Sequence, residues 1–188
     1  MSRRLLLALA FAGLVSGLVI AAITLASDHI DDPESETVLR LLVGWSFIGT
    51  GLFAWWRRPA NATGRLMVAA GFAWFATSLS ASDNDLLFTI GISLDALFPA
   101  ICGHLLIAFP SGRLETPAER WVVGSTYFAV TVLQLPSLLF EEPGTPKNLL
   151  IVHGNQPLSD ALDAMQLGVA VVILAVSWVL IIRRARAG

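Results

Sequence analysis

Apolar residues gather into six stretches that are separated by short polar gaps. The stretches are Leu5–Ala26, Val38–Trp56, Leu66–Ser82, Leu86–Phe109, Trp121–Phe140 and Ala164–Ile182. A helix of about 20 apolar residues crosses the roughly 30 Å hydrocarbon core of a bilayer. Helices also satisfy their own backbone polar groups in lipid. The pattern therefore predicts an all-α polytopic membrane protein, a bundle of six transmembrane helices that forms one membrane domain over residues 1–188.

The charged residues of the gaps alternate in sign and predict the orientation of this bundle. Every second gap is basic, with Arg3, Arg4, Arg57, Arg58, Arg65, Arg113, Arg120, Arg183, Arg184 and Arg186. The other gaps are acidic, with Asp28, Asp31, Asp32, Glu34, Glu36, Asp83, Asp85, Glu141, Glu142, Asp160 and Asp163. Because arginine and lysine are retained on the cytoplasmic side, we expect both termini inside, with the lipid bilayer as the main partner. Arginine outnumbers lysine eleven to one, which is typical of GC-rich bacterial genomes and favours a bacterial cytoplasmic (inner) membrane.

Composition narrows the chemistry further. The chain is 55% hydrophobic, its net charge is −2, and Cys102 is its single cysteine. A single cysteine excludes an intramolecular disulfide. The three histidines are scattered and do not have the spacing of metal ligands. No phosphate-binding glycine loop or paired catalytic residues stand out. The sequence therefore predicts no enzyme activity, no cofactor, no metal and no nucleic-acid partner.

The first apolar stretch carries a ladder of small residues, Gly13, Gly17 and Ala21, at four-residue spacing. Such a ladder lets two helix backbones approach closely. It predicts either packing within the bundle, which we favour, or the seam of a homodimer. A signal peptide is the other interpretation of this stretch, but its 22 residues exceed the apolar region of about 7–15 residues in such peptides.

Asp95 is the acidic residue placed deepest within a predicted span. A charge there costs about 2.5–3.5 kcal/mol on insertion scales, so the residue should face the bundle interior, find a partner or stay protonated. Gly91 and Pro99 flank it at four-residue spacing, and a proline removes a helical hydrogen bond. Asp95, Gly91 and Pro99 are therefore the candidate intramembrane switch or ligand site. The alternative is a purely structural role, in which Asp95 is a buried carboxyl hydrogen-bonded to a neighbouring hydroxyl.

Two basic turns carry a family resemblance. The first is Trp55-Trp56-Arg57-Arg58-Pro59-Ala60-Asn61-Ala62-Thr63-Gly64-Arg65-Leu66, and the second is His104-Leu105-Leu106-Ile107-Ala108-Phe109-Pro110-Ser111-Gly112-Arg113-Leu114. Together with the terminal Arg183-Arg184-Ala185-Arg186, they resemble the N-terminal multi-span membrane (sensor) region of actinobacterial two-component sensor histidine kinases. The turn Phe109, Pro110, Ser111, Gly112 and Arg113 is the more specific of the two.

The resemblance implies a sensory input module for signal transduction that lacks the kinase core in this chain. A cytoplasmic kinase domain or partner following Gly188 is then expected, and no binding residues carry over from the family. Two other classes stay open. Six spans in this length also suit a small solute-binding or transport subunit of the energy-coupling type, and the few polar intramembrane residues suit a structural subunit of a membrane complex.

Overall fold

The computed structural model describes residues 2–187, and the side chains of residues 2–183. This part of the chain is helical and contains no strand. The elements in order are α1 (Arg3–Leu25), α2 (Pro33–Arg57), α3 (Thr63–Thr77), η1 (Ser78–Ala81), α4 (Asp85–Ser93), α5 (Leu97–Ala108), α6 (Pro117–Phe128), η2 (Ala129–Leu133), α7 (Leu135–Phe140) and α8 (Gln156–Ala187). The expected basic residues Arg184 and Arg186 lie outside the described side chains.

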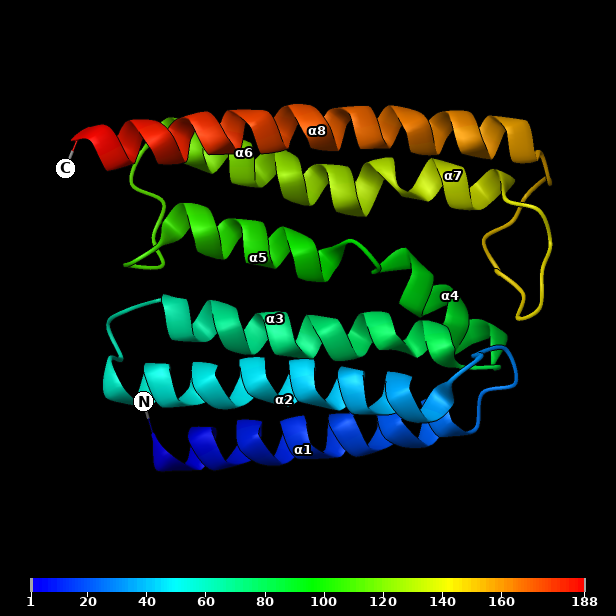
Figure 1. Cartoon of the computed structure of the whole chain (residues 1–188), viewed down its shortest axis with the longest axis horizontal. Coiled ribbons are helices and arrows are strands. Elements are labelled where there is room, and N and C mark those ends of the chain that lie inside the picture. Colours follow the sequence, from blue (N-terminus) through cyan, green and yellow to red (C-terminus); the bar gives the residue numbers. More distant parts are fainter. Residues whose placement is uncertain (1, 188) are drawn as a thin grey trace.

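The helices run side by side along one long axis, and the two ends of the bundle differ (Figure 1). The N-terminus, the C-terminus, the α2–α3 turn and the α5–α6 turn lie at one end. The α1–α2, η1–α4 and α7–α8 connections lie at the other end. We call these the basic end and the acidic end, after the charges that the sequence places in their loops. The alternation read from the sequence thus becomes a separation of charge along the bundle axis.

Five helical segments of the described chain are long and apolar enough to cross a membrane, by length and composition: Arg3–Leu25, Pro33–Arg57, Asp85–Ala108, Pro117–Phe140 and Gln156–Arg183. The span predicted at Leu66–Ser82 is not among these five segments, because its α-helix is shorter. Its α-helical part, α3, has 15 residues and measures about 22 Å at 1.5 Å per residue. The four residues of η1 extend it to about 30 Å, since a 3₁₀-helix rises about 2 Å per residue.

Two predicted continuous spans are interrupted. The span predicted at Leu86–Phe109 consists of α4 and α5, which are separated by Leu94, Asp95 and Ala96. Pro99 stands in the first turn of α5, where the missing N–H has no helical partner to lose. The span predicted at Trp121–Phe140 changes to a π-helical segment, η2, before α7. Neither of these two predicted spans is therefore one continuous α-helix.

Small residues bring α1, α2 and α3 close together. A Cβ on Gly13 would lie 3.0 Å from Ile48, and one on Gly17 would collide with the Trp45 indole, whose Nε1 donates to the Gly13 carbonyl at 3.0 Å. Ala21 is half-buried in the same helix. The face that carries Gly13 and Gly17 is therefore covered by α2 of the same chain, as the packing interpretation of the ladder expects. The apolar core continues through Ile20, Leu52, Val68 and Phe75.

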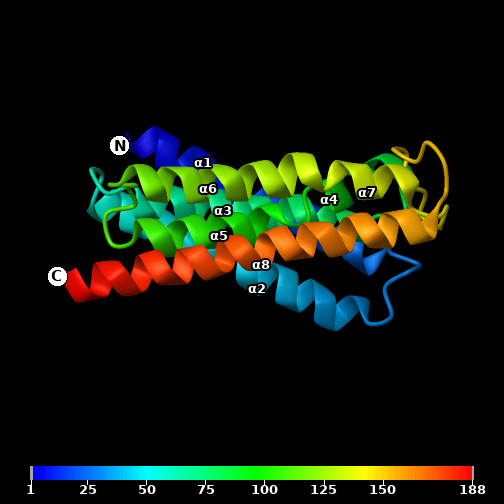
Figure 2. The ribbon, with the colours of Figure 1, turned by 90° about the horizontal axis from the view of Figure 1, so that it is seen from above.

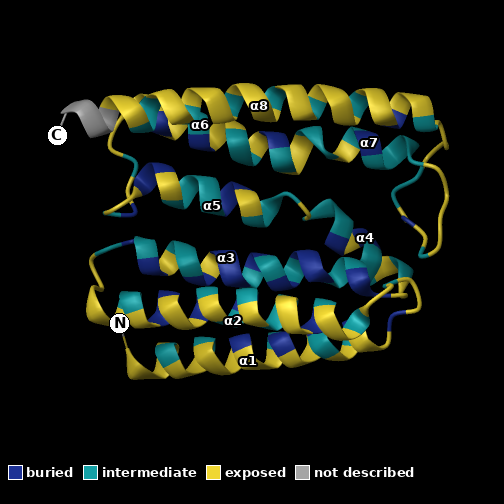
Figure 3. Cartoon of the chain, viewed as in Figure 1, coloured by how far each residue is buried: buried dark blue, intermediate teal, exposed yellow. Residues whose placement is uncertain are grey.

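Helix α8 begins at Gln156, eight residues before the predicted start at Ala164. Asn155 explains the earlier start, because its side chain and backbone oxygens accept from the N–H of Leu158, at 3.2 and 3.0 Å. Asp160 and Asp163 therefore lie on the helix rather than in a loop, which corrects the predicted boundary. Figure 2 shows this long helix running along the bundle beside α6, and Figure 3 shows that most of its residues are exposed.

Candidate functional site

A polar cavity of about 530 Å³ lies where the α4–α5 break, α7 and the start of α8 meet. Its lining residues are Ser80, Ile92, Asp95, Ala96, Gln134, Ser137, Leu138, Glu141, Gln156, Ser159, Asp163 and Gln166. Volumes of roughly 300–1,000 Å³ are typical of small-molecule sites. Nine of these twelve residues are polar, in a chain that is 55% hydrophobic. The cavity is thus the place where the bundle concentrates side chains able to bind a polar ligand.

Asp95 reaches this cavity because the helix breaks around it. Its backbone N–H donates to the Ile92 carbonyl at 3.3 Å, and the following residues turn before α5 begins. The carboxyl is exposed, and no hydrogen bond to it is found within the described part of the chain. The alternative interpretation, a buried carboxyl bonded to a neighbouring hydroxyl, therefore does not describe Asp95 in this structure. The structure instead points to a carboxyl available to a ligand.

Gly91 positions the wall of the cavity that Asp95 belongs to. A Cβ at this position would overlap the Ser80 backbone nitrogen and lie 2.6 Å from the Leu79 carbonyl carbon. Helix α4 therefore lies directly against η1, with no side chain between the two backbones. Pro99, the third residue of the predicted site, is exposed and does not line the cavity. Gly91 and Pro99 thus shape the break, while Asp95 is the member that faces the cavity.

Gln134 supplies an acceptor deep in the cavity wall. Its Nε2 donates to the Ile92 carbonyl at 2.8 Å, which ties η2 to the end of α4. Its Oε1 is buried, and within the described residues it has no hydrogen-bond partner. An unpaired buried acceptor costs about 1–3 kcal/mol. A ligand that donates a hydrogen bond to this oxygen would recover that cost.

The outer turns of α8 form the far wall. Ser159 is buried, and its Oγ donates to the Ser137 carbonyl at 3.1 Å. Gln156 bridges the loop and the helix, since its Oε1 accepts from the Glu142 N–H and its Nε2 donates to Asp160. Asp163 follows one turn along the same helix. The end of α8 that is fixed by hydrogen bonds is therefore the end that lines the cavity.

The cavity is strongly unbalanced in charge. Asp95, Glu141 and Asp163 line it, and none of the described lining residues is Arg, Lys or His. Glu141 accepts from Asn148 Nδ2 at 2.9 Å, which is a neutral donor. Within the described residues, no three His, Cys, Asp or Glu side chains are close enough together to hold a metal ion. The three carboxyls are thus spread over the wall instead of converging on one point.

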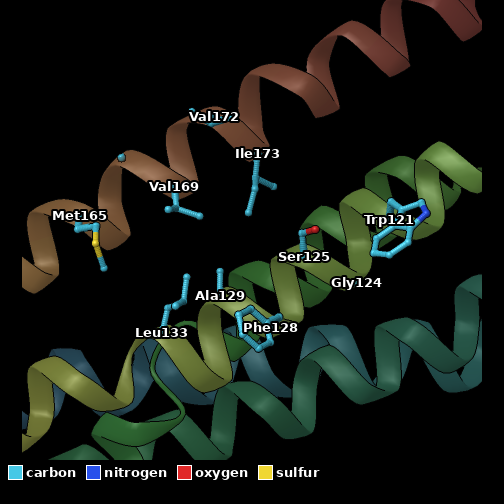
Figure 4. A pocket seen from close by; sticks show the side chains of 11 residues that line it. Trp121, Gly124, Ser125, Phe128, Ala129, Leu133, Met165, Val169, Val172 and Ile173 are labelled. Carbon is cyan, nitrogen blue, oxygen red and sulfur yellow. The ribbon is translucent and has the colours of Figure 1, made fainter.

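A second cavity, of about 930 Å³, separates α6 and η2 from the middle of α8. Figure 4 shows the side chains that face each other across it, namely Ser125, Ala129 and Leu133 from one side and Met165, Val169 and Ile173 from the other. Gly124 and Gly168 also line it, and a Cβ on either would meet nothing within 4 Å. We call this space the α8 groove. Its lining is almost entirely apolar, so it does not suit a polar ligand.

At the basic end, the two turns that carry the family resemblance contact each other. Asn61 Nδ2 and Thr63 Oγ1 both donate to the Pro110 carbonyl, at 2.9 and 3.1 Å. The Ala62 N–H donates to the Ser111 carbonyl at 3.0 Å. Gly112 adopts φ 71°, a left-handed conformation in which a Cβ would also press on the backbone between Ala62 and Thr63. Tight packing thus accounts for the composition of this turn.

The neighbouring residues Phe109 and Arg113 complete that contact. Phe109 is exposed and ends α5. Arg113 donates from its guanidinium to the Ala60 carbonyl at 3.3 Å. The turn from Phe109 to Arg113 is therefore a structural clamp between α2–α3 and α5–α6, and it contributes no residue to the polar cavity.

At the acidic end, a histidine joins the first loop to the loop before α4. His29 Nδ1 lies 2.8 Å from the Asp83 carboxylate, and its Nε2 lies 3.2 Å from the Ser80 carbonyl. The Ser27 hydroxyl also lies 3.1 Å from His29 Nδ1, so the ring is held from three sides. The hydrogen bonds from His29 and from the Asp28 backbone lower the pKa of Asp83 below its ordinary value. The His29–Asp83 pair lies next to Ser80, at the edge of the polar cavity.

Sequence reasoning singled out Asp95 but not the residues that surround it. Gln134 was overlooked because it lies within an apolar stretch and carries no charge, although an amide in a membrane span is itself a signal. Ser159 and Asp163 were assigned to a loop because charged residues end the apolar stretch there.

No protein-family model, curated protein or solved structure that was compared with the chain matches it.

Proposed function

We propose that the chain is a membrane-embedded sensory input module of the two-component histidine kinase class, which binds a small ligand in the polar cavity and reports it through α8. The observation that carries the proposal is the course of α8. Gln156, Ser159, Asp163 and Gln166 line the cavity at one end of this helix, and the same unbroken helix reaches Arg183 and the basic end. A displacement at the cavity is therefore transmitted along one rigid element.

The packing of α8 supports this role. Its half-buried or buried residues between 159 and 180 follow each other at three or four positions, so a single stripe of the helix touches the bundle. Along its middle, the α8 groove leaves space between this stripe and α6. Helices packed along one stripe shift by about 1–2 Å in switching proteins. Lipid chains can fill the groove and yield when α8 moves.

The charge distribution supports the orientation of the module in a bacterial inner membrane. The end that holds both termini carries most of the arginines, although Arg40 lies toward the other end. Because arginine is retained in the cytoplasm, this distribution supports an orientation with that end inside. The cavity then opens on the outer half of the bundle, between the acidic loops. The resemblance of the clamped turns to sensor kinases supports the signalling class, with a kinase domain or partner receiving the motion of α8.

A test of the coupling does not require the ligand. In a Cys102→Ser background, a cysteine in place of Leu138 on α7 is modified with a trimethylammonium-ethyl methanethiosulfonate reagent, which fills the cavity covalently. Hydrogen exchange of the inner turns of α8 is then followed by mass spectrometry. We expect the exchange rate of residues 174–183 to change. The matched control is the same reagent on a cysteine in place of Leu42, which is exposed on α2.

Unchanged exchange in α8 after complete modification of Leu138→Cys would refute the coupling, and with it the sensory role. A change of equal size in the Leu42→Cys control would show that the reagent acts through the membrane rather than through the cavity.

A second candidate function is a solute-binding subunit of a transport system. The specific observation that favours it is the concentration of nine polar residues in one cavity, which gives the bundle a place for a polar solute. Such a subunit would hold its solute tightly enough to be purified with it. Mass spectrometry of the protein extracted from its native membrane separates the two candidates, since a sensor in exchange with its ligand is recovered empty and a binding subunit is recovered with one molecule per chain.

A further inference from the structure

The polar cavity offers a ligand many acceptors and few donors. The hydroxyl of Ser137 donates to the Gln134 carbonyl, and that of Ser159 donates to the Ser137 carbonyl. The protons of both hydroxyls are therefore committed, and only their lone pairs remain. Gln134 adds the buried Oε1 that has no partner within the described residues. Ser80 and Gln166 also line the cavity and carry donors, but the three carboxyls and Gln134 Oε1 are acceptors, and this excess favours a ligand that brings hydrogen-bond donors.

The charge of the cavity adds a second constraint. Asp95 from the α4–α5 break, Glu141 from the end of α7 and Asp163 from α8 line one space of about 530 Å³. No basic side chain lies among the described lining residues to balance them. Three carboxyls along the lining, with no cation among its described residues, give the cavity a negative potential. This potential attracts a positively charged ligand and repels an anionic one.

The spacing of the carboxyls distinguishes between kinds of cation. A metal ion needs several ligand atoms within about 2.0–2.6 Å of one point. In the described chain, the acidic side chains do not converge in this way. An elongated organic cation can instead place separate ammonium groups near separate carboxyls. Its N–H groups also match the unpaired oxygen of Gln134.

We propose that the polar cavity binds a small organic cation with several N–H donors, of the aliphatic polyamine class. This assignment rests on the proposed role of the cavity as the ligand site of the module. Asp95 and Asp163 hold the ammonium groups from opposite walls, and Gln134 Oε1 accepts from an N–H between them. A cation that bridges Asp95 and Asp163 draws the outer end of α8 toward the α4–α5 break. Ligand binding and the motion of α8 are then one event.

Isothermal titration calorimetry of the full chain in the neutral detergent dodecyl maltoside tests the assignment. The probes are spermidine and putrescine, with Mg²⁺ alone as a compact dication and triethylene glycol as an uncharged chain. We expect saturable binding of at least one polyamine. Because a hydrogen bond to a charged group is strong, Asp95→Asn and Asp163→Asn should each weaken it at least about tenfold. Asp31→Asn, which removes an exposed carboxyl outside the cavity, should leave the affinity unchanged.

Three results would overturn the assignment. The first is no saturable binding of either polyamine. The second is polyamine binding that Asp95→Asn and Asp163→Asn leave unchanged. The third is binding of Mg²⁺ or triethylene glycol that is as tight and as sensitive to Asp95→Asn as polyamine binding. None of these results removes the sensory role, which the covalent filling of the cavity tests separately. Conversely, tight polyamine binding with an unresponsive α8 would keep the assignment and refute the sensory role.

Discussion

Replacing Gly91 by alanine should destabilise the protein, although alanine is the better helix former. The alanine Cβ would overlap the Ser80 backbone nitrogen and lie 2.6 Å from two further backbone atoms, the Leu79 carbonyl carbon and Ser80 Cα. Backbone atoms cannot rotate away, so α4 and η1 must separate. Overpacking of this kind costs about 1–3 kcal/mol or more, while the gain in helix propensity is about 1 kcal/mol at most.

Gly103→Ala is the matched control for this prediction. Gly103 lies in the neighbouring helix α5, and a Cβ there would meet nothing within 4 Å. The same gain in helix propensity applies and no collision opposes it, so this variant should be slightly stabilised. The two substitutions, chemically identical, should therefore change stability in opposite directions.

Thermal unfolding followed by tryptophan fluorescence measures both variants. A change of 1 kcal/mol moves the midpoint of a chain of this size by about 2–4 °C. We expect a midpoint below that of the parent chain for Gly91→Ala and one at or above it for Gly103→Ala. Equal midpoints for the two variants would show that α4 does not lie against η1 as described, and the position of Asp95 in the cavity wall would then be wrong.

Three further predictions concern the basic end, the acidic end and the α8 groove. Asn61→Ala removes the donor to Pro110 and should lower the free energy of unfolding by about 1–2 kcal/mol, measured by denaturant titration. Hydrogen bonds hold the native pKa of Asp83 below 3.8, the ordinary pKa of aspartate, so its carboxylate stabilises the fold fully above pH 3.8. This stabilisation is lost as the pH falls through the lower native pKa. The thermal unfolding midpoints of Asp83→Asn and of the parent chain should therefore differ at neutral pH and converge in acid. Gly168→Leu should fill the groove and suppress the exchange response of α8 to cavity filling, whereas Gly49→Leu, equally open but outside the groove, should not.

The sequence predicted the membrane helices well because the signal is local. Each apolar stretch is long enough to be read by itself, and the described structure places a helix over every one of them. The separation of basic and acidic loops was equally readable, since alternate loops of a helical bundle must lie at opposite ends. The break beside Asp95 was indicated by Gly91 and Pro99, because glycine and proline are both unfavourable inside a continuous helix.

The polar cavity could not be predicted in the same way, because it is a property of how the helices pack. Gln134, between η2 and α7, and Asp163, on α8, are 29 positions apart, and no sequence spacing brings them together. Their juxtaposition follows from the π-helical segment η2 and from the early start of α8. The early start of α8 has a local cause, the cap at Asn155, but the position of Gln134 is fixed by its bond to the distant Ile92 carbonyl.

The coupling between the polar cavity and α8 is tested most directly by a distance measured across the basic end. Nitroxide labels on cysteines in place of Phe53 on α2 and Ile182 on α8, both exposed, report the position of α8 by pulsed electron paramagnetic resonance in a Cys102→Ser background. The cavity is filled by Leu138→Trp, with Leu106→Trp, at an exposed site on α5, as the control. We predict a shift of the mean distance on the order of 1–2 Å with the first substitution and none with the second. Superimposable distances with the cavity filled and empty would contradict the proposed coupling.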